Sequence, residues 1–434
     1  MKLVIVGTGY VGLVSGLCFA EFGFETICVD TDKNRIDNLK RGECPFYEPG
    51  LENLLHKHLN QTKLLTLNAS LSKAMVDADI IFITVGTPTK RLEDEADLSA
   101  VYKVAEDIAN NINKYCLIVT KSTVPVGTTR KINKIIGNKV NKENFDTVSN
   151  PEFLREGSAI TDFMRPDRVV IGSDTKRAEQ MMRELYRPLY LLETPIVSTT
   201  IESAEIIKYA SNSFLATKIA FINQVADLCE VTGGNIQDVA KAMGLDKRIG
   251  SKFLHAGPGF GGSCFPKDVK AFNSTAKKLN INLSILDAVN QSNQIRPETI
   301  AIKISNYFNN NLKNITFSFL GLSFKPDTDD VRDSTSIIIA ESLYDRGATI
   351  NAFDPQGIKN AKKILPNINY CQSIEESCIN ADAIIIATEW NEFRALNFKL
   401  LKEKMKDYVI FDLRNIYNKE ELNNLEFVYY GIGK

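Results

Sequence analysis

The chain has 434 residues, of which 52 are basic and 53 are acidic, so its net charge is close to zero. This length predicts two or three domains, each large enough to bury a core of its own. A nearly neutral chain lacks the excess positive charge that binds nucleic acids and anionic membranes, so we expect neither as a partner. The apolar run at residues 2–6 is too short for a signal peptide or a membrane span, which predicts a cytoplasmic protein.

The cysteines and histidines give no sign of a metal centre. Eight cysteines are scattered over the chain, only three histidines are present, and no C-x-x-C motif occurs. This set lacks the ligand spacing of a zinc site, so we predict no metal. Reduced thiols are the default state in the cytoplasm.

The first elements are typical of a dinucleotide-binding domain. A short apolar strand at residues 2–6 runs into Gly7, Gly9 and Gly12, a G-x-G-x-x-G motif that should open a helix over residues 11–22. A second strand ends at Asp30, 18 residues after Gly12. A carboxylate at about this spacing binds the adenosine ribose of NAD and would repel the 2′-phosphate of NADP. The motif therefore predicts a Rossmann domain that binds NAD.

Two later strands, at residues 79–85 and 116–120, end in loops rich in hydroxyl groups. Ligands of open α/β sheets bind beyond the carboxyl ends of the strands, so both loops should face the same crevice as the glycine loop. We expect Thr87 and Thr123 to lie there. The alternative is that these threonines only begin turns.

A strand at residues 145–148 leads into a polar stretch with Glu152 and Glu156. Two glutamates beside an arginine and an X-Pro turn look like site residues, although the exposed start of a helix would carry them equally well. A strand at residues 167–171 and a charged helix near residues 175–187 follow.

Residues 201–231 contain no proline or glycine, and apolar residues recur there at helical spacing, which predicts one long helix that bridges two domains. Lys208 and Asn212 are one turn apart and share a face of it. A buried lysine and asparagine need polar partners, and a bound ligand would supply them. A solvated stripe is the alternative. Further helices are expected near residues 236–243 and 283–296.

The stretch at residues 257–268 contains four glycines and two prolines, with Cys264 near its centre. We predict a loop without regular secondary structure. Lys252 and Lys267 supply positive charge near the thiol, and Asp268 supplies a carboxylate, which is what a nucleophilic cysteine needs. An inert, buried cysteine beside a tight turn is the alternative.

The last third of the chain repeats the first domain in outline. Strands are expected at residues 315–320, 349–353 and 381–388, the second of them followed by an acid, but the G-x-G-x-x-G motif is missing. This order predicts a second Rossmann-like domain. Two cations beside its glycine turn, Lys325 and Arg332, suit a nucleotide diphosphate.

Five ordered motifs resemble those of the nucleotide-sugar 6-dehydrogenases, the UDP-glucose/GDP-mannose dehydrogenase family, over essentially the whole chain. They lie at residues 7–12, 122–128, 150–157, 261–268 and 325–334. The stretch at residues 253–259 looks most like the branch that acts on UDP-glucose. The alternatives within the family are a GDP-mannose 6-dehydrogenase and a UDP-N-acetylhexosamine 6-dehydrogenase, the latter a poor fit to residues 152–156.

The resemblance implies an NAD-dependent oxidation of UDP-glucose to UDP-glucuronate with two NADH per substrate. In this family Cys264 would hold the sugar carbon as a thiohemiacetal and then as a thioester that water hydrolyses. Lys208 and Asn212 would stabilise the oxyanion, and Asp268 would activate the water. Glu152 and Thr123 would position that water or carry protons. The catalytic residues implied are Cys264, Lys208, Asn212, Asp268, Glu152 and Thr123.

The resemblance also implies two sets of binding residues and an assembly. The cofactor contacts are Gly7, Gly9, Val11, Gly12, Asp30, Arg35, Thr87, Thr123, Glu156, Lys267 and Arg332. The substrate contacts are Glu152, Phe153, Leu154, Lys208, Asn212, Arg248, Phe253, Leu254, His255, Ala256, Gly257, Gly261 and Lys325. In this family a neighbouring subunit often supplies the residue that Arg248 matches, and the long helix forms the core of a homodimer, which we expect as the minimum assembly.

The predicted fold class is α/β, with two Rossmann-like, doubly wound parallel-sheet domains joined by a long central helix and a helical dimerisation region. The expected boundaries are 1–200 for the NAD-binding domain, 201–300 for the central helical domain and 301–434 for the C-terminal domain that binds the UDP-sugar.

Two other classes of protein remain open. Single-step hydroxyacid dehydrogenases share the combination of a Rossmann domain with a long helical domain, but they transfer one hydride and need no thiol. A non-enzymatic nucleotide-binding or regulatory protein would lose only stability on Cys264→Ser.

Overall fold

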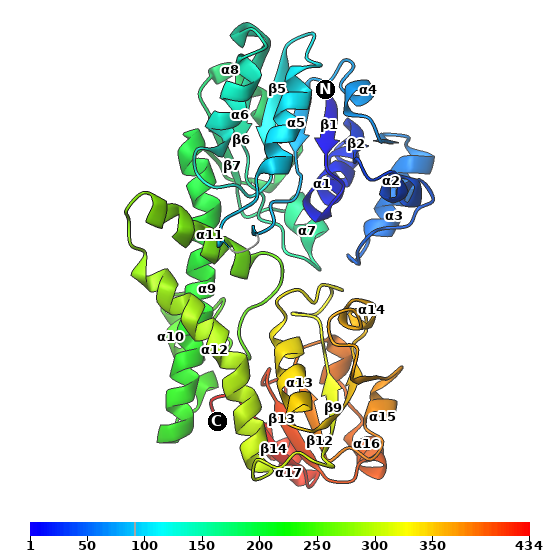
Figure 1. Ribbon diagram of the computed structural model, residues 1–434, viewed down its shortest axis with the longest axis vertical. Coiled ribbons are helices and arrows are strands. Elements are labelled where there is room, and N and C mark those ends of the chain that lie inside the picture. The colour runs from blue at the N-terminus through cyan, green and yellow to red at the C-terminus, as the bar shows by residue number, and fades with distance from the viewer. Residues whose placement is uncertain (91–92) are drawn as a thin grey trace. The chain divides into compact units, whose positions relative to one another are not determined.

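The computed structural model describes residues 1–90 and 93–434, and the chain divides into two compact units. The first unit comprises Met1–Ser211 and Ser274–Asn280, and the second comprises Asn212–Asn273 and Ile281–Lys434. The boundary falls within helix α9 (Ile201–Thr232), which therefore belongs to both units (Figure 1). The single long helix expected over residues 201–231 is confirmed. The three-domain division at residues 200 and 300 stays a prediction.

The first unit is built on an eight-stranded sheet with the order β3-β2-β1-β4-β5-β6-β7-β8. Its strands are β1 (Lys2–Val6), β2 (Glu25–Val29), β3 (Leu65–Asn68), β4 (Ile80–Ile83), β5 (Cys116–Thr120), β6 (Phe145–Ser149), β7 (Val169–Ser173) and β8 (Ile196–Thr199). Neighbouring strands are parallel except β6 and β7, which pair antiparallel. The predicted doubly wound, parallel-sheet fold is confirmed, and the antiparallel pair of β6 and β7 is the one exception in this sheet.

Alternate residues of β1 point to opposite faces of this sheet, and each face has its own core. Leu3 and Ile5 lie in the core that α1, α7 and α8 cover, whereas Val4 and Val6 lie in the core under α5 and α6. The helices of this unit are α1 (Tyr10–Glu21), α2 (Lys33–Lys40), α3 (Leu51–His56), α4 (Leu71–Ala74), α5 (Ser99–Ala109), α6 (Thr128–Gly137), α7 (Ala159–Met164) and α8 (Lys176–Leu185). Burial on both faces explains the continuous apolar run of β4.

The second unit contains a six-stranded, wholly parallel sheet with the order β11-β10-β9-β12-β13-β14. Numbered from β9, this is the order 3-2-1-4-5-6 of a Rossmann domain, which confirms the predicted second copy. The strands are β9 (Thr316–Leu320), β10 (Thr349–Phe353), β11 (Asn369–Tyr370), β12 (Ala383–Ile386), β13 (Val409–Asp412) and β14 (Val428–Gly431).

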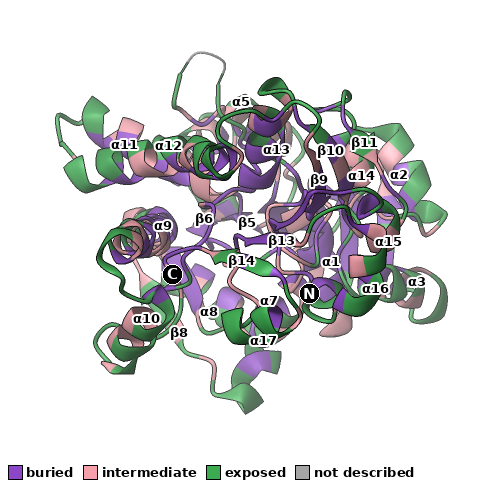
Figure 2. Ribbon diagram, turned by 90° about the horizontal axis from the view of Figure 1, so that it is seen from below, coloured by how far each residue is buried: buried purple, intermediate pink, exposed green. Residues whose placement is uncertain are grey.

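Helices cover both faces of the second sheet as well. Phe317 and Phe319 pack in one core with residues of α12 and α13, and Ile384 and Ile386 pack in another with residues of α16. The helices are α10 (Ile236–Leu245), α11 (Phe265–Lys278), α12 (Ser284–Tyr307), α13 (Thr335–Asp345), α14 (Ile358–Ala361), α15 (Ile374–Ser377), α16 (Phe398–Lys404) and α17 (Lys419–Asn424). Figure 2 shows the strands largely buried, whereas helices such as α10 and α17 are largely exposed.

Two expectations about helix limits are corrected. The loop predicted over residues 257–268 ends at Cys264, because α11 begins at Phe265 and takes Pro266 into its first turn. A proline is tolerated there, since the first N–H groups of a helix have no partner within it. The helix expected over residues 283–296 runs on through Pro297 to Tyr307.

The two Rossmann-like sheets carry an acid at the same place, directly after β2 and directly after β10. Asp30 Oδ2 accepts hydrogen bonds from the N–H of Thr8 (2.9 Å) and from its Oγ1 (2.8 Å). Asp354 Oδ2 accepts them from the N–H of Ser323 (2.9 Å) and from its Oγ (2.7 Å). Each acid thus holds the turn that follows the first strand of its sheet. Asp354 is fully buried, whereas Asp30 is partly exposed.

Among the described helices, none combines the length and apolar character needed to cross a membrane.

Candidate active site

The glycine loop of the first unit leaves room for a ligand at its backbone. Gly7 adopts a φ of +105°, which favours glycine, and a methyl group added at Gly12 would lie 1.8 Å from the Gly7 carbonyl oxygen. At Gly9 an added methyl group would meet nothing within 4 Å, so this residue borders open space. Val11 lies beside it in the first turn of α1 and is half-buried. The N-terminal turn of α1 can therefore receive a diphosphate.

The partly exposed carboxylate of Asp30 fits the ribose side of NAD. Burial opposes its ionisation, but hydrogen bonds from the N–H groups of Asp32 and Thr8 outweigh this effect and lower the pKa of Asp30. Arg35 adds an ion pair at 3.1 Å. The carboxylate is therefore ionised at neutral pH, where it can accept from ribose hydroxyls and repel a 2′-phosphate.

The two hydroxyl-rich loops of the first unit lie together, as predicted from the strand ends. Thr87 Oγ1 donates to the carbonyl of Thr123 at 2.9 Å, and Ser122 Oγ donates to the carbonyl of Val85 at 2.7 Å. Both loops follow neighbouring strands, β4 and β5, at the carboxyl edge of the sheet. Thr87 is buried, so its hydroxyl holds the loop of Thr123 in place.

A buried ion pair joins two predicted catalytic residues of the first unit. Lys208 Nζ lies 2.9 Å from Glu152 Oε1, and both side chains are 5% exposed. The other oxygen of Glu152 accepts the N–H of Leu154, and the Phe153 ring packs 5.4 Å from Lys208 Nζ. The stretch predicted to bind substrate is thus fixed to α9 by its own glutamate. Glu156 is also buried.

A second lysine lies behind this pair and was not predicted. Lys121 directly follows β5, is buried, and donates from Nζ to Asn150 Oδ1 (3.2 Å) and the Tyr186 hydroxyl (3.3 Å). The Tyr186 hydroxyl also donates to Asn150 Oδ1 at 2.7 Å. Burial lowers the pKa of Lys121 to about 8.

We expect Lys121→Met to stabilise the protein at pH 7. The unchanged protein should gain stability between about pH 8 and pH 10.5, and the variant should lack this gain. The pKa of Lys121 falls from 10.5 to about 8 on folding. The unfolded chain binds more protons in this window, so the stability of the unchanged protein rises with pH there, by roughly 3 kcal/mol. The measurement is the difference between the thermal midpoints of the two proteins at pH 7 and at pH 9.5. An equal difference between the midpoints at both pH values would contradict this prediction.

In the second unit, Asp268 is the centre of a buried polar cluster. It is 1% exposed, its Oδ2 accepts from Asn212 Nδ2 at 2.7 Å, and its Oδ1 lies 2.6 Å from Lys267 Nζ. The Asp268 N–H donates to the Cys264 carbonyl at 2.8 Å, the first hydrogen bond of α11. Cys264 is half-buried and lies 3.7 Å from Ser263 Oγ. Its thiol stands at the N-terminus of a helix, where the partial positive charge stabilises an anion.

The loop before Cys264 is close-packed against the loops that follow β9 and β13. A methyl group added at Gly261 would lie 2.3 Å from the Asp333 carbonyl oxygen. At Gly257 it would lie 3.5 Å from Nη1 of Arg414, a cation that sequence reasoning missed. The Lys325 amine lies 5.5 Å from the ring centroid of Phe324, a residue that also packs against this loop.

Some predicted contacts lie apart from these clusters in the single chain. Arg248 is 89% exposed and pairs with Asp246, and His255 is exposed. The Arg332 side chain is 65% exposed and pairs with Asp330, while its carbonyl accepts the Gly262 N–H at 2.9 Å. In the same stretch as His255, Leu254 and Ala256 are buried and Phe253 has a φ of +63°.

Two glutamates that hold the predicted loops were missed. Glu205, three residues before Lys208 on α9, accepts the N–H groups of Gly127 and Thr129 at 2.7 Å each and so caps α6. Glu48 is buried and accepts the N–H of Gly157 at 2.6 Å and that of Ala159 at 2.7 Å. Both contacts join residues far apart in the chain. No local pattern of sequence marks a glutamate for a contact with backbone groups 76 to 111 residues away.

Comparison with protein families accounts for both units. The NAD binding domain of the UDP-glucose/GDP-mannose dehydrogenase family matches residues 1–190, its central domain matches residues 202–295, and its UDP binding domain matches residues 318–419. The chain belongs to the UDP-glucose/GDP-mannose dehydrogenase family. Membership of this family confirms the resemblance in the motifs and agrees with the fit of Asp30 and the glycine loop to NAD.

Individual members of the family match over the whole length. A UDP-glucose 6-dehydrogenase of Rhizobium meliloti (strain 1021) is 48% identical, with 100% of each chain covered. One of Rickettsia conorii (strain ATCC VR-613 / Malish 7) is 46% identical over 100% of this chain and 99% of its own. The structure of a UDP-glucose dehydrogenase from the archaeon Pyrobaculum islandicum superimposes with a TM-score of 0.91 at 35% identity, covering 100% of this chain and 97% of the other.

Proposed function

We propose that this chain is an NAD-dependent UDP-glucose 6-dehydrogenase that converts UDP-glucose to UDP-glucuronate with the release of two NADH. The observation that carries the proposal is the cluster of Asn212, Asp268 and Lys267 at the start of the helix that Cys264 precedes, in a chain with the family's NAD and UDP binding domains. Relatives named UDP-glucose 6-dehydrogenase at 46–48% identity favour UDP-glucose over GDP-mannose and UDP-N-acetylhexosamines.

The first unit supplies the cofactor site. The glycine loop and Asp30 would hold the diphosphate and the adenosine ribose, with Arg35, Thr87, Thr123 and Glu156 as further contacts. The second unit would add Lys267 and Arg332. When bound, NAD accepts a hydride from C6 of the sugar in each of two oxidations.

Cys264 holds the sugar between these oxidations. Its sulfur adds to the carbon of the C6 aldehyde while the carbonyl oxygen gains a proton, which gives a thiohemiacetal. Loss of a hydride from C6 and of that proton from oxygen leaves a thioester. Water then cleaves the carbon–sulfur bond, which yields the carboxylate and restores the thiol.

Lys208 and Asn212 stabilise the negative charge that develops on the C6 oxygen. They stand one turn apart on α9, so an ammonium and an amide N–H are presented on one helix face. Their buried side chains are held by Glu152 and by Asp268. Donors fixed before the reaction need no reorganisation during it, which is the source of their effect on rate.

Asp268 orients the water that cleaves the thioester, and Glu152 and Thr123 position that water or carry protons. Asn212 and Lys267 contact different oxygens of Asp268 and therefore fix the direction of its carboxylate. A carboxylate fixed in this way is suited to accept a proton from an attacking water.

The UDP-sugar would bind along Glu152, Phe153 and Leu154 of the first unit and along a longer set of the second. That second set is Phe253, Leu254, His255, Ala256, Gly257, Gly261 and Lys325. Arg248 would act on the substrate of a neighbouring subunit, as its 89% exposure allows.

The number of NADH molecules released per substrate tests this proposal. Purified protein with limiting UDP-glucose and excess NAD is expected to form two NADH per UDP-glucose, with UDP-glucuronate as product. One NADH per substrate would instead indicate a single-step dehydrogenase. Turnover with GDP-mannose or a UDP-N-acetylhexosamine but not with UDP-glucose would show that the proposed substrate is wrong. A folded protein that forms no NADH would refute the proposed enzyme activity.

A homodimer is the proposed assembly, supported by an apolar stripe on α9. Phe214, Phe221 and Leu228 follow one another at seven-residue spacing and are 66%, 50% and 62% exposed. Residues at this spacing lie on one side of a helix, as in helices that pack against a partner. A second copy of α9 would bury this stripe.

We expect Phe221→Glu to convert the homodimer to monomers at micromolar concentration, because a charge in the centre of an apolar interface is left without a partner. Light scattering after size exclusion measures the mass of each protein. Lys103→Glu on α5, which also introduces a glutamate at an exposed position, serves as the control. A dimeric Phe221→Glu variant would place the interface elsewhere.

A cytoplasmic location and a role of UDP-glucuronate in polysaccharide synthesis complete the proposal. Both fit a product that is a donor of glucuronosyl units, and both remain predictions.

A further inference from the structure

The loop before Cys264 is held by side chains at both N–H and C=O groups of two of its residues. The Gly257 N–H donates to Asn223 Oδ1 at 2.8 Å, and its carbonyl accepts from Arg296 Nε at 2.5 Å. The Phe260 N–H donates to Asn293 Oδ1 at 2.8 Å, and its carbonyl accepts from Asn293 Nδ2 at 2.9 Å. Buried backbone groups outside helices and sheets need such partners. Gly257 and Phe260 are both buried.

Asn293 and Arg296 are one turn apart on α12 and face the loop together. The fit is tight at Gly259 as well, where an added methyl group would lie 2.7 Å from Asn293 Oδ1. Because both residues stand on a long helix, the loop takes its position from a rigid element rather than from its own backbone.

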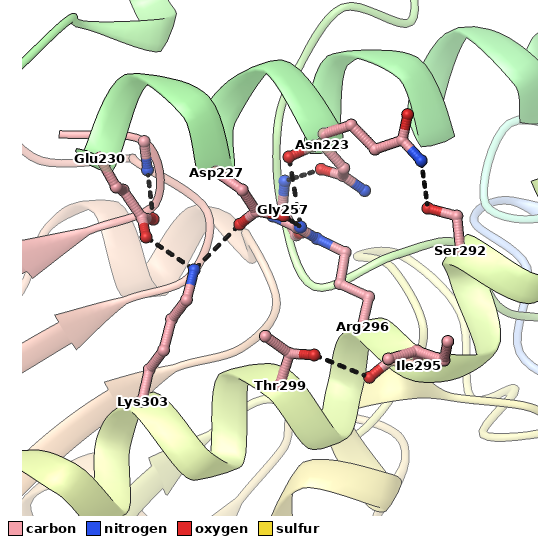
Figure 3. Close-up of polar contacts among 11 residues, drawn as sticks. Asn223, Asp227, Glu230, Gly257, Ser292, Ile295, Arg296, Thr299 and Lys303 are labelled. Atoms are coloured by element: carbon pink, nitrogen blue, oxygen red, sulfur yellow. Dashed lines mark hydrogen bonds and ion pairs between the residues drawn. The ribbon is translucent and has the colours of Figure 1, made fainter. Parts of the chain in front are cut away.

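Arg296 also connects the loop to a polar network between α9 and α12, which Figure 3 shows. Its Nη1 lies 3.0 Å from Asp227, and Lys303 bridges Asp227 at 2.9 Å and Glu230 at 2.6 Å. Glu230 in turn accepts the N–H of Gly433, near the end of the chain. The ion pairs of Lys303 thus hold α12 against α9, whereas the direct pair with Asp227 places the Arg296 guanidinium.

The arrangement at Arg296 is not what stability alone would favour. The side chain is 6% exposed, and its Nη2 is buried without a hydrogen-bond partner among the residues that the structure describes. Burying a guanidinium with an unmatched donor is unfavourable, and an apolar residue would pack there at lower cost. The hydrogen bond from this arginine fixes the position of the Gly257 carbonyl.

We propose that Asn293 and Arg296 are positioning residues for the covalent step, because they fix the backbone at Gly257 and Phe260 and thereby the place from which the Cys264 sulfur reaches the sugar. This inference rests on the proposed function. Displacing a reacting group by about 1 Å costs on the order of a hundredfold in rate, so a loosened loop lowers kcat more than it weakens binding. Neither residue touches the substrate in this account.

The first test is Asn293→Ala, with Gln294→Ala, the next and exposed residue of α12, as the matched control. Asn293→Ala removes both hydrogen bonds to Phe260. We expect kcat to fall about tenfold or more, with KM for NAD unchanged within about twofold. Hydrogen exchange at residues 259–262 should become about tenfold faster, while Gln294→Ala leaves exchange and kcat unchanged.

Arg296→Lys is the second test, and Lys303→Met is its control. Lysine keeps the charge beside Asp227 but cannot also hold the Gly257 carbonyl in the same geometry, because it has a single, tetrahedral donor group. We expect kcat to fall about tenfold with the thermal midpoint no lower than in Lys303→Met. Lys303 shares the ion pairs but contacts no atom of the loop, so its loss should leave kcat within about twofold.

The outcomes separate the two proposals. Faster exchange in the loop together with a lower kcat supports the positioning role. Faster exchange with an unchanged kcat overturns it, and so does unchanged exchange in Asn293→Ala. If the unchanged protein releases no NADH from UDP-glucose, the proposed function fails and the positioning role fails with it, whereas normal turnover in the unchanged protein confines any failure to Asn293 and Arg296.

Discussion

Cys264→Ser is expected to lower the rate of NADH formation from UDP-glucose by roughly a thousandfold or more while the fold and the binding of NAD are kept. A serine hydroxyl is a much weaker nucleophile than a thiol, because its far higher pKa leaves almost none of it ionised at neutral pH. The second oxidation then lacks its covalent intermediate. The measurements are steady-state NADH formation and the affinity for NAD of both proteins.

Cys44→Ser is the matched control for this change. Among the eight cysteines, Cys44 and Cys264 are the two that are half-buried, and the other six are buried. Cys44 lies in the first unit, outside the groups assigned to catalysis, so its replacement should leave turnover within about twofold. Full activity of Cys264→Ser would refute the covalent mechanism, whatever the control shows.

Lys208→Met is expected to have the second largest effect, because it damages both stability and rate. Removing one partner of a buried ion pair leaves the Glu152 carboxylate buried without its cation, which costs about 3–5 kcal/mol. Loss of the donor at the C6 oxygen lowers kcat by about a hundredfold to a thousandfold. Denaturant unfolding and steady-state NADH formation measure the two effects separately.

The double variant Lys208→Met with Glu152→Gln separates structure from chemistry. An amide carries no charge that needs compensation, so much of the lost stability should return, while turnover stays low because the ammonium and the Glu152 carboxylate are both absent. Lys103→Met, at an exposed pair with Asp107, is the control and should cost less than about 1 kcal/mol. Recovery of turnover in the double variant would show that Lys208 acts only by neutralising Glu152.

The parts of the fold that follow from local sequence were predicted well. Strand β1, the glycine loop and α1 form a contiguous motif, and α9 is a long run of helical periodicity without a proline or glycine, so each signal lies within one window of sequence. The short strands β3 and β8 at the two ends of the first sheet were missed. They have four residues each and are only partly buried, so neither shows the continuous apolar run of a central strand.

The candidate site divides in the same way. Cys264, Lys208 and Asn212 could be singled out because a motif or a helical spacing marks them. The residues that position the surrounding loops could not, since the contacts of Asn293 with Phe260 and of Glu205 with Gly127 join segments 33 and 78 residues apart. Helix α11 was not predicted, and its residues 265–268 were assigned to the loop, because glycine and proline suggest a loop although a proline is also tolerated in the first turn of a helix.

The acids after β2 and β10 show how one scaffold acquires two specificities. In the second sheet, both carboxylate oxygens of Asp354 accept from backbone N–H groups. Oδ2 accepts from Leu322 and Ser323, and Oδ1 accepts from Gln356 and Gly357. In the first sheet, Asp30 keeps part of its carboxylate at the surface. The order of the strands therefore does not determine which nucleotide a sheet binds. Besides the missing G-x-G-x-x-G motif, the second site differs from the first in that its acid is no longer accessible after the chain has folded around it.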